Sequence, residues 1–309
     1  MTKRDYLSVD DLSSEELTQL LNDAAKMKKA KPEKNADALR GEHVALIFEK
    51  PSTRTRVSME VAVASLGGNS VVLRGDELQL GRGETIEDTG RVLSRYVDAI
   101  AVRTFGQERL EALSAGSTVP VINLLSDQSH PCQVLADLLT IQEHVTEKLS
   151  GVKVAYIGDG NNVAHSLLIA GAKMGMEVRV ASPPGYEPDG EIVERAREIA
   201  AYTEGKVIVS DLVAEAAEGA DVLYTDVWAS MGQEDESDAR ARVFDAYRID
   251  EEVVSMASPD VKVMHCLPAH RGEEISAGVM DSERSIVWDQ AENRLHTQKA
   301  LLIWLLAQE

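Results

Sequence analysis

The stretch "VKVAYIGDGNNVAHSLLIAGAKMGMEVRVAS", residues 152–182, decides the fold class. A strand-like apolar run, a glycine turn, an apolar helical pattern and a second apolar run follow one another, which is typical of a βαβ unit in a parallel sheet. The turn "GDGNNV" lacks the spacing G-x-G-x-x-G, and the second run ends at Ala181 and Ser182 without an acidic residue for a ribose hydroxyl. The stretch therefore predicts an α/β unit and disfavours a nicotinamide cofactor.

Apolar runs that alternate with helical patterns continue on both sides of this stretch. The first series has runs at 44–48, 70–73, 99–103 and 119–124, with helical patterns near 53–66, 85–96 and 107–115. The second series has runs at 152–158, 177–182, 206–211, 221–228, 261–268 and 285–290. We expect two α/β domains, each a parallel β-sheet flanked by helices, which the polar join "KLSGVK" separates. The first domain is 1–148 and the second is 149–290; a C-terminal helix spans 291–309, and "GQEDESDARAR" is expected to be a charged loop.

Composition and charge narrow the classes of function. The 309 residues carry a formal net charge of −20, from 52 acidic and 32 basic residues, which disfavours nucleic acid and anionic membranes as partners. Such acidity also suggests a halophilic source. The chain has two cysteines, no secretory leader pattern and no apolar run of membrane-spanning length. We expect a cytoplasmic protein.

The segment "PSTRTR", residues 51–56, predicts an anion site. Ser52 is suited to cap a helix whose first turn contains Thr53, Arg54 and Thr55. A helix N-terminus carries partial positive charge, so cations there indicate a missing anion, and phosphate fits best. The alternative is a solvated helix start whose arginines pair with carboxylates, and we interpret Arg56 as such an ion pair.

Further polar residues follow the ends of strand-like runs, where open α/β sheets bind ligands. In "SDQSHPCQ", His130 precedes a helix and Gln133 offers an amide, although this motif alone favours an ordinary capping histidine. Arg103 ends another run, as a ligand or as an ion-pair partner. Asp226 ends a third run, where it either holds an ammonium group or caps the next segment. The histidines and cysteines of "HPC" and "HCLP" match no common zinc spacing, so no metal is expected.

Taken together, these motifs resemble the aspartate and ornithine carbamoyltransferases. "FEKPSTRTR", "HPCQ", "GDGNNVAHS", "DVWASMG", "HCLPAHRGEE" and "AENR" occur in the family's order and spacing across nearly the whole chain. Within that family, "SMG" and "HCLP" are typical of the members that use ornithine. The resemblance implies a first domain for carbamoyl phosphate, a second for the amino acid, and a C-terminal helix that packs back on the first. It also implies no cofactor, and a homotrimer or multiple of trimers with intersubunit active sites.

The resemblance further implies roles for individual residues. Those implied for carbamoyl phosphate are Ser52, Thr53, Arg54, Thr55, Arg103, His130, Gln133, Cys266, Leu267, Arg294 and, from a neighbouring chain, Gln79. Those implied for ornithine are Asn162, Asp226, Ser230 and Met231. Catalytic roles are implied for Arg103, His130, Asp226 and Cys266.

The implied reaction transfers a carbamoyl group between carbamoyl phosphate and the side-chain amine of L-ornithine. It gives L-citrulline and phosphate, or runs in reverse in arginine catabolism. Three alternatives remain at this point: a carbamoyltransferase with another amine acceptor, a nicotinamide oxidoreductase, and a non-catalytic sensor of phosphate compounds or amino acids.

Overall fold

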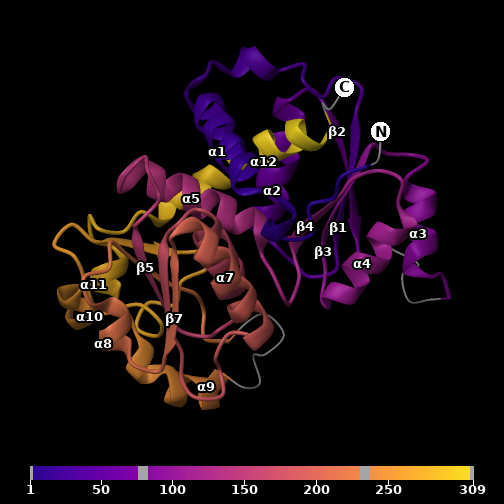
Figure 1. The fold of residues 1–309 in the computed structure, drawn as a ribbon. Coiled ribbons are helices and arrows are strands. Elements are labelled where there is room, and N and C mark those ends of the chain that lie inside the picture. The colour runs from indigo at the N-terminus through magenta and orange to yellow at the C-terminus, as the bar shows by residue number, and fades with distance from the viewer. Residues whose placement is uncertain (1–2, 76–82, 230–236, 307–309) are drawn as a thin grey trace. The chain divides into compact units, whose positions relative to one another are not determined.

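The computed structural model describes residues 3–75, 83–229 and 237–306. The chain forms two compact units, one of residues 1–136 and 293–309 and the other of residues 137–292 (Figure 1). Within the described residues, no helix combines the length and the apolar character needed to cross a bilayer.

The first unit contains a four-stranded parallel sheet in the order β2-β1-β3-β4. The strands are β1 (His43–Phe48), β2 (Asn69–Arg74), β3 (Ala99–Arg103) and β4 (Val121–Leu125). The helices are α1 (Ser14–Lys29), α2 (Thr53–Ser65), α3 (Ile86–Leu93), α4 (Gln107–Gly116), the start of α5 (Pro131–His144) and most of α12 (Val287–Leu306). The parallel sheet and its alternation with helices confirm the prediction.

Helices cover both faces of this sheet. On one face, Leu110 and Leu113 of α4 pack against alternate strand residues such as Ile47 and Ile100. Figure 1 shows α3 and α4 on this side and α2 on the other. From Asn293 on, the C-terminal helix α12 belongs to the first unit as expected, and Lys28 Nζ of α1 donates to Asn293 Oδ1 at 2.8 Å.

The second unit contains a five-stranded parallel sheet in the order β7-β6-β5-β8-β9. The strands are β5 (Lys153–Ile157), β6 (Glu177–Ala181), β7 (Lys206–Ser210), β8 (Val222–Thr225) and β9 (Lys262–His265). The helices are α6 (Asn162–Lys173), α7 (Gly190–Thr203), α8 (Val213–Ala217), α9 (Ser237–Phe244), α10 (Glu251–Met256) and α11 (Ala277–Met280). Ala216 of α8, Val253 of α10 and Val279 of α11 pack on Leu223 and Val263 in one core.

Two expected elements differ from the structure. Residues 285–290 are not a strand, because only Ser285 forms a bridge, with Val263, and helix α12 begins at Val287. The apolar run "IVW" is short, and Asp289 in the first turn favours a helix N-terminus. The expected loop 232–242 is helical from Ser237, since α9 ends in Phe244, a fully buried core residue.

Each sheet has one position where the strand order reverses. β1 lies between β2 and β3, so the chain leaves β1 and β3 toward opposite sides of the first sheet. β5 lies between β6 and β8 in the same way in the second sheet. Open α/β sheets bind ligands outside the carboxyl ends of the strands at such switch points. A ligand-binding site is therefore expected at the segments that follow β1, β3, β5 and β8.

Candidate functional site

The segment after β1 forms the predicted helix start. Ser52 is the N-cap of α2, and its Oγ accepts a hydrogen bond from Thr55 N at 3.2 Å. The first turn contains no acidic residue. Arg56 is exposed and its Nε pairs with Glu60 Oε1 at 2.7 Å, which confirms its structural interpretation. Arg54 is partly buried, at the end of the helix that favours anions.

His130 is the centre of a group of positive charges in the first unit. Its side chain is buried just before α5, and burial lowers its pKa well below the ordinary value. The charges of Arg294, Arg103 and Arg54 lower that pKa further. His130 is therefore a neutral imidazole at pH 7, which can donate one hydrogen bond to an oxygen atom. Arg103 is the last residue of β3 and is also buried, at the switch point of this sheet.

Arg294 connects three helices of the first unit. Its Nη2 donates to Thr55 Oγ1 of α2 at 2.8 Å, and its Nη1 donates to Gln133 Oε1 of α5 at 3.1 Å. All three side chains are at least 97 % buried. Because Thr55 Oγ1 accepts from Arg294, the Thr55 hydroxyl hydrogen can be donated elsewhere. These contacts bring Thr55, Gln133 and Arg294 together.

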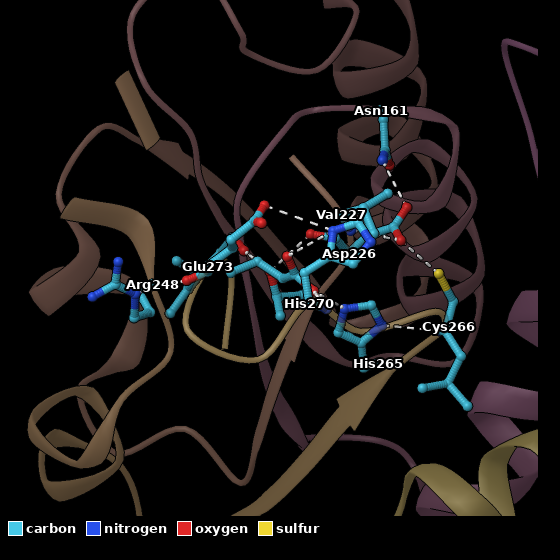
Figure 2. Close-up of polar contacts among 12 residues, drawn as sticks. Asn161, Asp226, Val227, Arg248, His265, Cys266, His270 and Glu273 are labelled. Carbon is cyan, nitrogen blue, oxygen red and sulfur yellow. Dashed lines mark hydrogen bonds and ion pairs between the residues drawn. The ribbon is translucent and has the colours of Figure 1, made fainter. Parts of the chain in front are cut away.

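In the second unit, Asp226 follows β8 at the switch point of the sheet. Figure 2 shows its carboxylate between Asn161 and Cys266. Asp226 Oδ1 accepts from Val227 N and from Cys266 Sγ, both at 2.8 Å. Its Oδ2 accepts from Asn161 Nδ2 at 2.9 Å. The structure thus joins two predicted residues, Asp226 and Cys266, and a buried anionic group with lone pairs remaining can bind an ammonium group.

Sequence reasoning missed the role of Asn161. Asn161 is the N-cap of α6, where its Oδ1 accepts from Val163 N at 2.9 Å, and its amide nitrogen is left to orient Asp226. Tyr156 OH also donates to Asn161 Oδ1, at 3.2 Å. Burial raises the pKa of Tyr156 well above its ordinary value, so the phenol stays a donor. The predicted residue Asn162 is the next residue, the first of α6.

A second missed feature lies behind Cys266 and Leu267. His265 Nδ1 accepts from Leu267 N at 2.9 Å, so the ring hydrogen is on Nε2, which faces Glu274 Oε1 at 3.0 Å. His265 and Glu274 are both fully buried. Leu267 has φ of +60°, a conformation that side chains rarely adopt, and this hydrogen bond fixes it. The sequence contains His265, Leu267 and Glu274 in one motif, "HCLPAHRGEE", but it does not indicate that they are hydrogen-bonded to one another.

Three predicted residues lie outside the described part of the chain: Gln79, Ser230 and Met231. Arg240 of α9 follows Ser230 and Met231 in the sequence. It pairs with Asp159 Oδ2 at 2.9 Å and donates to Trp228 O at 2.9 Å. Burial raises the pKa of Asp159, while Arg240 opposes that rise. Arg240 therefore attaches the start of α9 to the β5–α6 turn.

Asp226, His265 and Cys266 place ligand atoms within 4.8 Å of one another, as a metal site requires. Both ring nitrogens of His265, however, are engaged with Leu267 N and Glu274. A metal ion there would have to displace one of these contacts. The geometry of these three residues thus favours a hydrogen-bonded arrangement over metal binding.

Comparison with known proteins identifies relatives over the full chain. Residues 4–143 match the carbamoyl-P binding domain of aspartate/ornithine carbamoyltransferase, and residues 150–305 match its Asp/Orn binding domain. The chain is 61% identical to an ornithine carbamoyltransferase from Parafrankia sp. strain EAN1pec over 308 residues, covering 99% of this chain and 97% of the relative. It is 57% identical to that of Acidothermus cellulolyticus over 304 residues, covering 98% and 96%. The solved ornithine carbamoyltransferase of Pyrococcus furiosus superimposes with a TM-score of 0.96 at 52% identity, covering 100% of this chain and 98% of that one.

Proposed function

Because the chain belongs to the aspartate/ornithine carbamoyltransferase family and forms citrulline from ornithine and carbamoyl phosphate, we propose a role for each half of its candidate site. The first unit binds carbamoyl phosphate at the N-terminus of α2, and the second unit binds ornithine beside Asp226. In the domain boundaries that we propose, the carbamoyl-phosphate domain is 1–148 with 291–309, and the ornithine domain is 149–290.

A group of positive charges around His130 supports the proposal that the first unit binds phosphate. In a chain with a net charge of −20, Arg54, Arg103 and Arg294 converge on a neutral buried His130. Ser52 caps α2 by accepting from Thr55 N, and Thr53 and Thr55 lie in the first turn, where the helix N-terminus favours an anion. A phosphate dianion neutralises this positive charge and accepts hydrogen bonds from the first turn of α2.

The same residues activate the carbamoyl group. Arg103, His130 and the Thr55 hydroxyl donate to the carbonyl oxygen, which becomes an oxyanion when an amine attacks. Preorganised donors of this kind are each worth about 2.7–4 kcal/mol in other enzymes. Gln133 faces the carbamoyl amide, and Arg294 holds both Gln133 and Thr55 in place. The departing phosphate is already bound at the helix N-terminus, so no metal is required.

The second unit supplies the nucleophile. Ornithine's side-chain amine, with a pKa near 10.4 if it resembles lysine, must lose a proton before its lone pair attacks. Asp226 and Cys266 are the groups proposed near that amine. The proposed ligands of the α-amino and α-carboxyl groups remain Asn162, Asp226, Ser230 and Met231. Cys266 and Leu267 remain proposed for the carbamoyl group.

We also propose a homotrimer, or a multiple of trimers, in which Gln79 of a neighbouring chain completes the phosphate site. An exposed apolar surface supports it: Val57 and Val61, one turn apart on α2, are 54% and 44% exposed, and Val71 on β2 is 42% exposed. Burying such side chains would stabilise an assembly by about 25 cal/mol per Å². Light scattering of the purified chain measures the mass, and a monomer at assay concentrations would contradict the trimer.

An acceptor screen tests the function itself. Citrulline formation from carbamoyl phosphate is measured with ornithine, and carbamoylation is measured in parallel with aspartate, putrescine and N-acetylornithine. We expect ornithine to give a kcat/KM at least about 100-fold above the others, because an unpaired polar group in a site costs several kcal/mol. Preference for another amine would overturn the assignment.

Asp226→Asn tests the ornithine half separately. The substitution removes the negative charge and should raise the KM for ornithine or abolish activity, while the affinity for carbamoyl phosphate, measured by calorimetry, stays within about twofold. Asp245→Asn is the matched control, because Asp245 is exposed and pairs only with Arg248 among the interactions seen in the described residues. An unchanged ornithine response in Asp226→Asn would remove this residue from the site.

A further inference from the structure

A cluster of three side chains lies on the second unit, in the loop between β9 and α11. His270 Nδ1 is 3.7 Å from Glu273 Oε2 and 3.9 Å from Glu274 Oε2. The ligand atoms of the three residues all lie within 4.8 Å of one another. Figure 2 shows His270 and Glu273 in this loop, and neither takes part in the proposed reaction. The side chains of His270 and Glu273 are 52% and 57% exposed, so an ion from solvent can reach them.

Glu274 distinguishes this cluster from an ordinary surface ion pair. Its side chain is fully buried, and Oε1 accepts from His270 N at 2.5 Å and lies 3.0 Å from His265 Nε2. Its Oε2 has no hydrogen-bond partner among the described residues, and it is the oxygen that faces His270 Nδ1. A buried carboxylate oxygen without a partner is costly, which points to a cationic ligand at this position.

The backbone of the loop holds the three residues in place. Arg248 Nε donates to Glu273 O at 2.7 Å, and Ile249 N donates to Glu274 O at 2.9 Å. The two nearby arginines direct their charges elsewhere, since Arg248 pairs with Asp245 and Arg271 pairs with Asp281. Within the described part of the chain, no lysine or arginine pairs with the carboxylate of Glu273 or Glu274.

We propose that His270, Glu273 and Glu274 form a binding site for a divalent first-row transition-metal ion, with Zn²⁺ as the best fit. Zinc binds imidazole nitrogen at about 2.0–2.1 Å and carboxylate oxygen at about 2.0–2.2 Å, so tetrahedral ligand atoms lie roughly 3.4 Å apart. His270 Nδ1 lies 3.7 and 3.9 Å from the two carboxylate oxygens, and all three ligand atoms lie within 4.8 Å of one another, so side-chain rotations would bring them to that separation. Water supplies the fourth ligand on the exposed side.

The ion has a structural role, because the site adjoins the turn that carries Cys266 and Leu267. Zinc on Glu274 Oε2 leaves Oε1 free to hold His265 Nε2, and His265 Nδ1 in turn holds Leu267 N. Metal binding therefore stabilises the folded loop from 265 to 274. The bond to zinc adds an electrostatic contact that the unfolded chain lacks.

Titration of the full-length chain with Co²⁺ and Zn²⁺ tests the site. Cys266→Ser is used alongside the wild type, because a thiolate ligand would produce a charge-transfer band in the near ultraviolet with Co²⁺. We expect both chains to bind the ion with visible d–d bands of nitrogen and oxygen ligands, and Zn²⁺ to raise the thermal unfolding midpoint. His270→Ala and Glu273→Gln should each weaken binding at least about tenfold and remove the shift in midpoint.

His144→Ala is the matched control. His144 is a partly exposed histidine whose Nε2 lies 2.9 Å from Asp289 Oδ2, and no second carboxylate pairs with it among the described residues. The affinity of the His144→Ala variant for the metal ion should be unchanged. His270→Ala and Glu273→Gln alter exposed side chains, and circular dichroism confirms their folding. Unchanged affinity in both variants, loss of the cobalt spectrum in Cys266→Ser, or no binding at millimolar metal would each overturn the proposal.

Discussion

At the scale of single residues, Arg54 and Arg56 show how position decides the function of a side chain. Both lie in the first turn of α2, yet Arg56 is exposed and forms an i,i+4 pair with Glu60, worth about 0.3–0.5 kcal/mol. Arg54 contributes to the positive field around His130. The two arginines therefore form an internal comparison for the phosphate role.

Arg54→Ala should weaken carbamoyl phosphate binding by roughly 10- to 100-fold, since a charged hydrogen bond contributes about 1.5–3 kcal/mol. Calorimetric titration with carbamoyl phosphate, or with a stable phosphonate analogue, measures the change. Arg56→Ala should bind within about twofold of the wild type. Equal losses in the two variants would mean that Arg54 has no special place at the phosphate.

His130 gives the stability of the protein a defined pH dependence. Its folded-state pKa lies well below the ordinary value, so between the two values the unfolded chain binds more protons. Stability should therefore fall as the pH drops below about 6.5, by at most about 1.4 kcal/mol per pH unit from this residue. Urea unfolding of the wild type and His130→Gln between pH 7 and pH 5 should show a smaller loss in the variant. Parallel curves would contradict a neutral buried His130.

Local residue patterns predicted some site features and missed others. The cap at Ser52 and the ion pair of Arg56 depend on neighbours three or four positions away, which a sequence displays directly. The contact of Asn161 with Asp226 was not predictable in this way, because the two residues are 65 positions apart. The pairing of Glu274 with His265 was also not predicted. Both side chains are fully buried, and this burial is visible only in the folded loop.

At the scale of elements, the central parallel strands were predicted because their apolar β-branched runs are buried on both faces, whereas the edge strands β2 and β7 are only partly buried. β3, for example, is buried at all five positions. Strand order was not predictable in this way, since β1 pairs with β3 through contacts 55 positions apart. The positions of Arg103 and Asp226 at the switch points of the two sheets are therefore known only from the structure. The run 285–290 misled because a three-residue apolar stretch has no helical or strand period.

Helix α12 delivers Arg294 to the first unit, and Arg294→Met tests what that contact does. The substitution leaves Thr55 Oγ1 and Gln133 Oε1 without this donor, at about 1–3 kcal/mol for each buried group. It also removes the largest charge effect on His130, whose pKa should rise. NMR titration and urea unfolding measure the two effects.

Lys28→Met is the control for this prediction. Lys28 also joins α12 to another helix, through Asn293, but its charge is not among the causes that lower the pKa of His130. Loss of stability without a change in that pKa is expected. If Arg294→Met behaves in the same way, Arg294 is only a packing residue and not part of the charge group.

At the scale of the whole molecule, the net charge of −20 predicts a response to salt. Repulsion between exposed carboxylates is screened as the Debye length falls from about 10 Å at 0.1 M to 3 Å at 1 M. If the source is halophilic, the thermal unfolding midpoint should rise steadily from low to molar KCl. A constant or falling midpoint would contradict halophilic adaptation.

A crystal of the protein soaked with a phosphonate analogue of carbamoyl phosphate tests the proposed phosphate site. We expect phosphonate density at the first turn of α2, between Ser52 and Thr55, in contact with the guanidinium of Arg54. Phosphonate density elsewhere, with that helix N-terminus lacking the ligand, would rule out the proposed phosphate site.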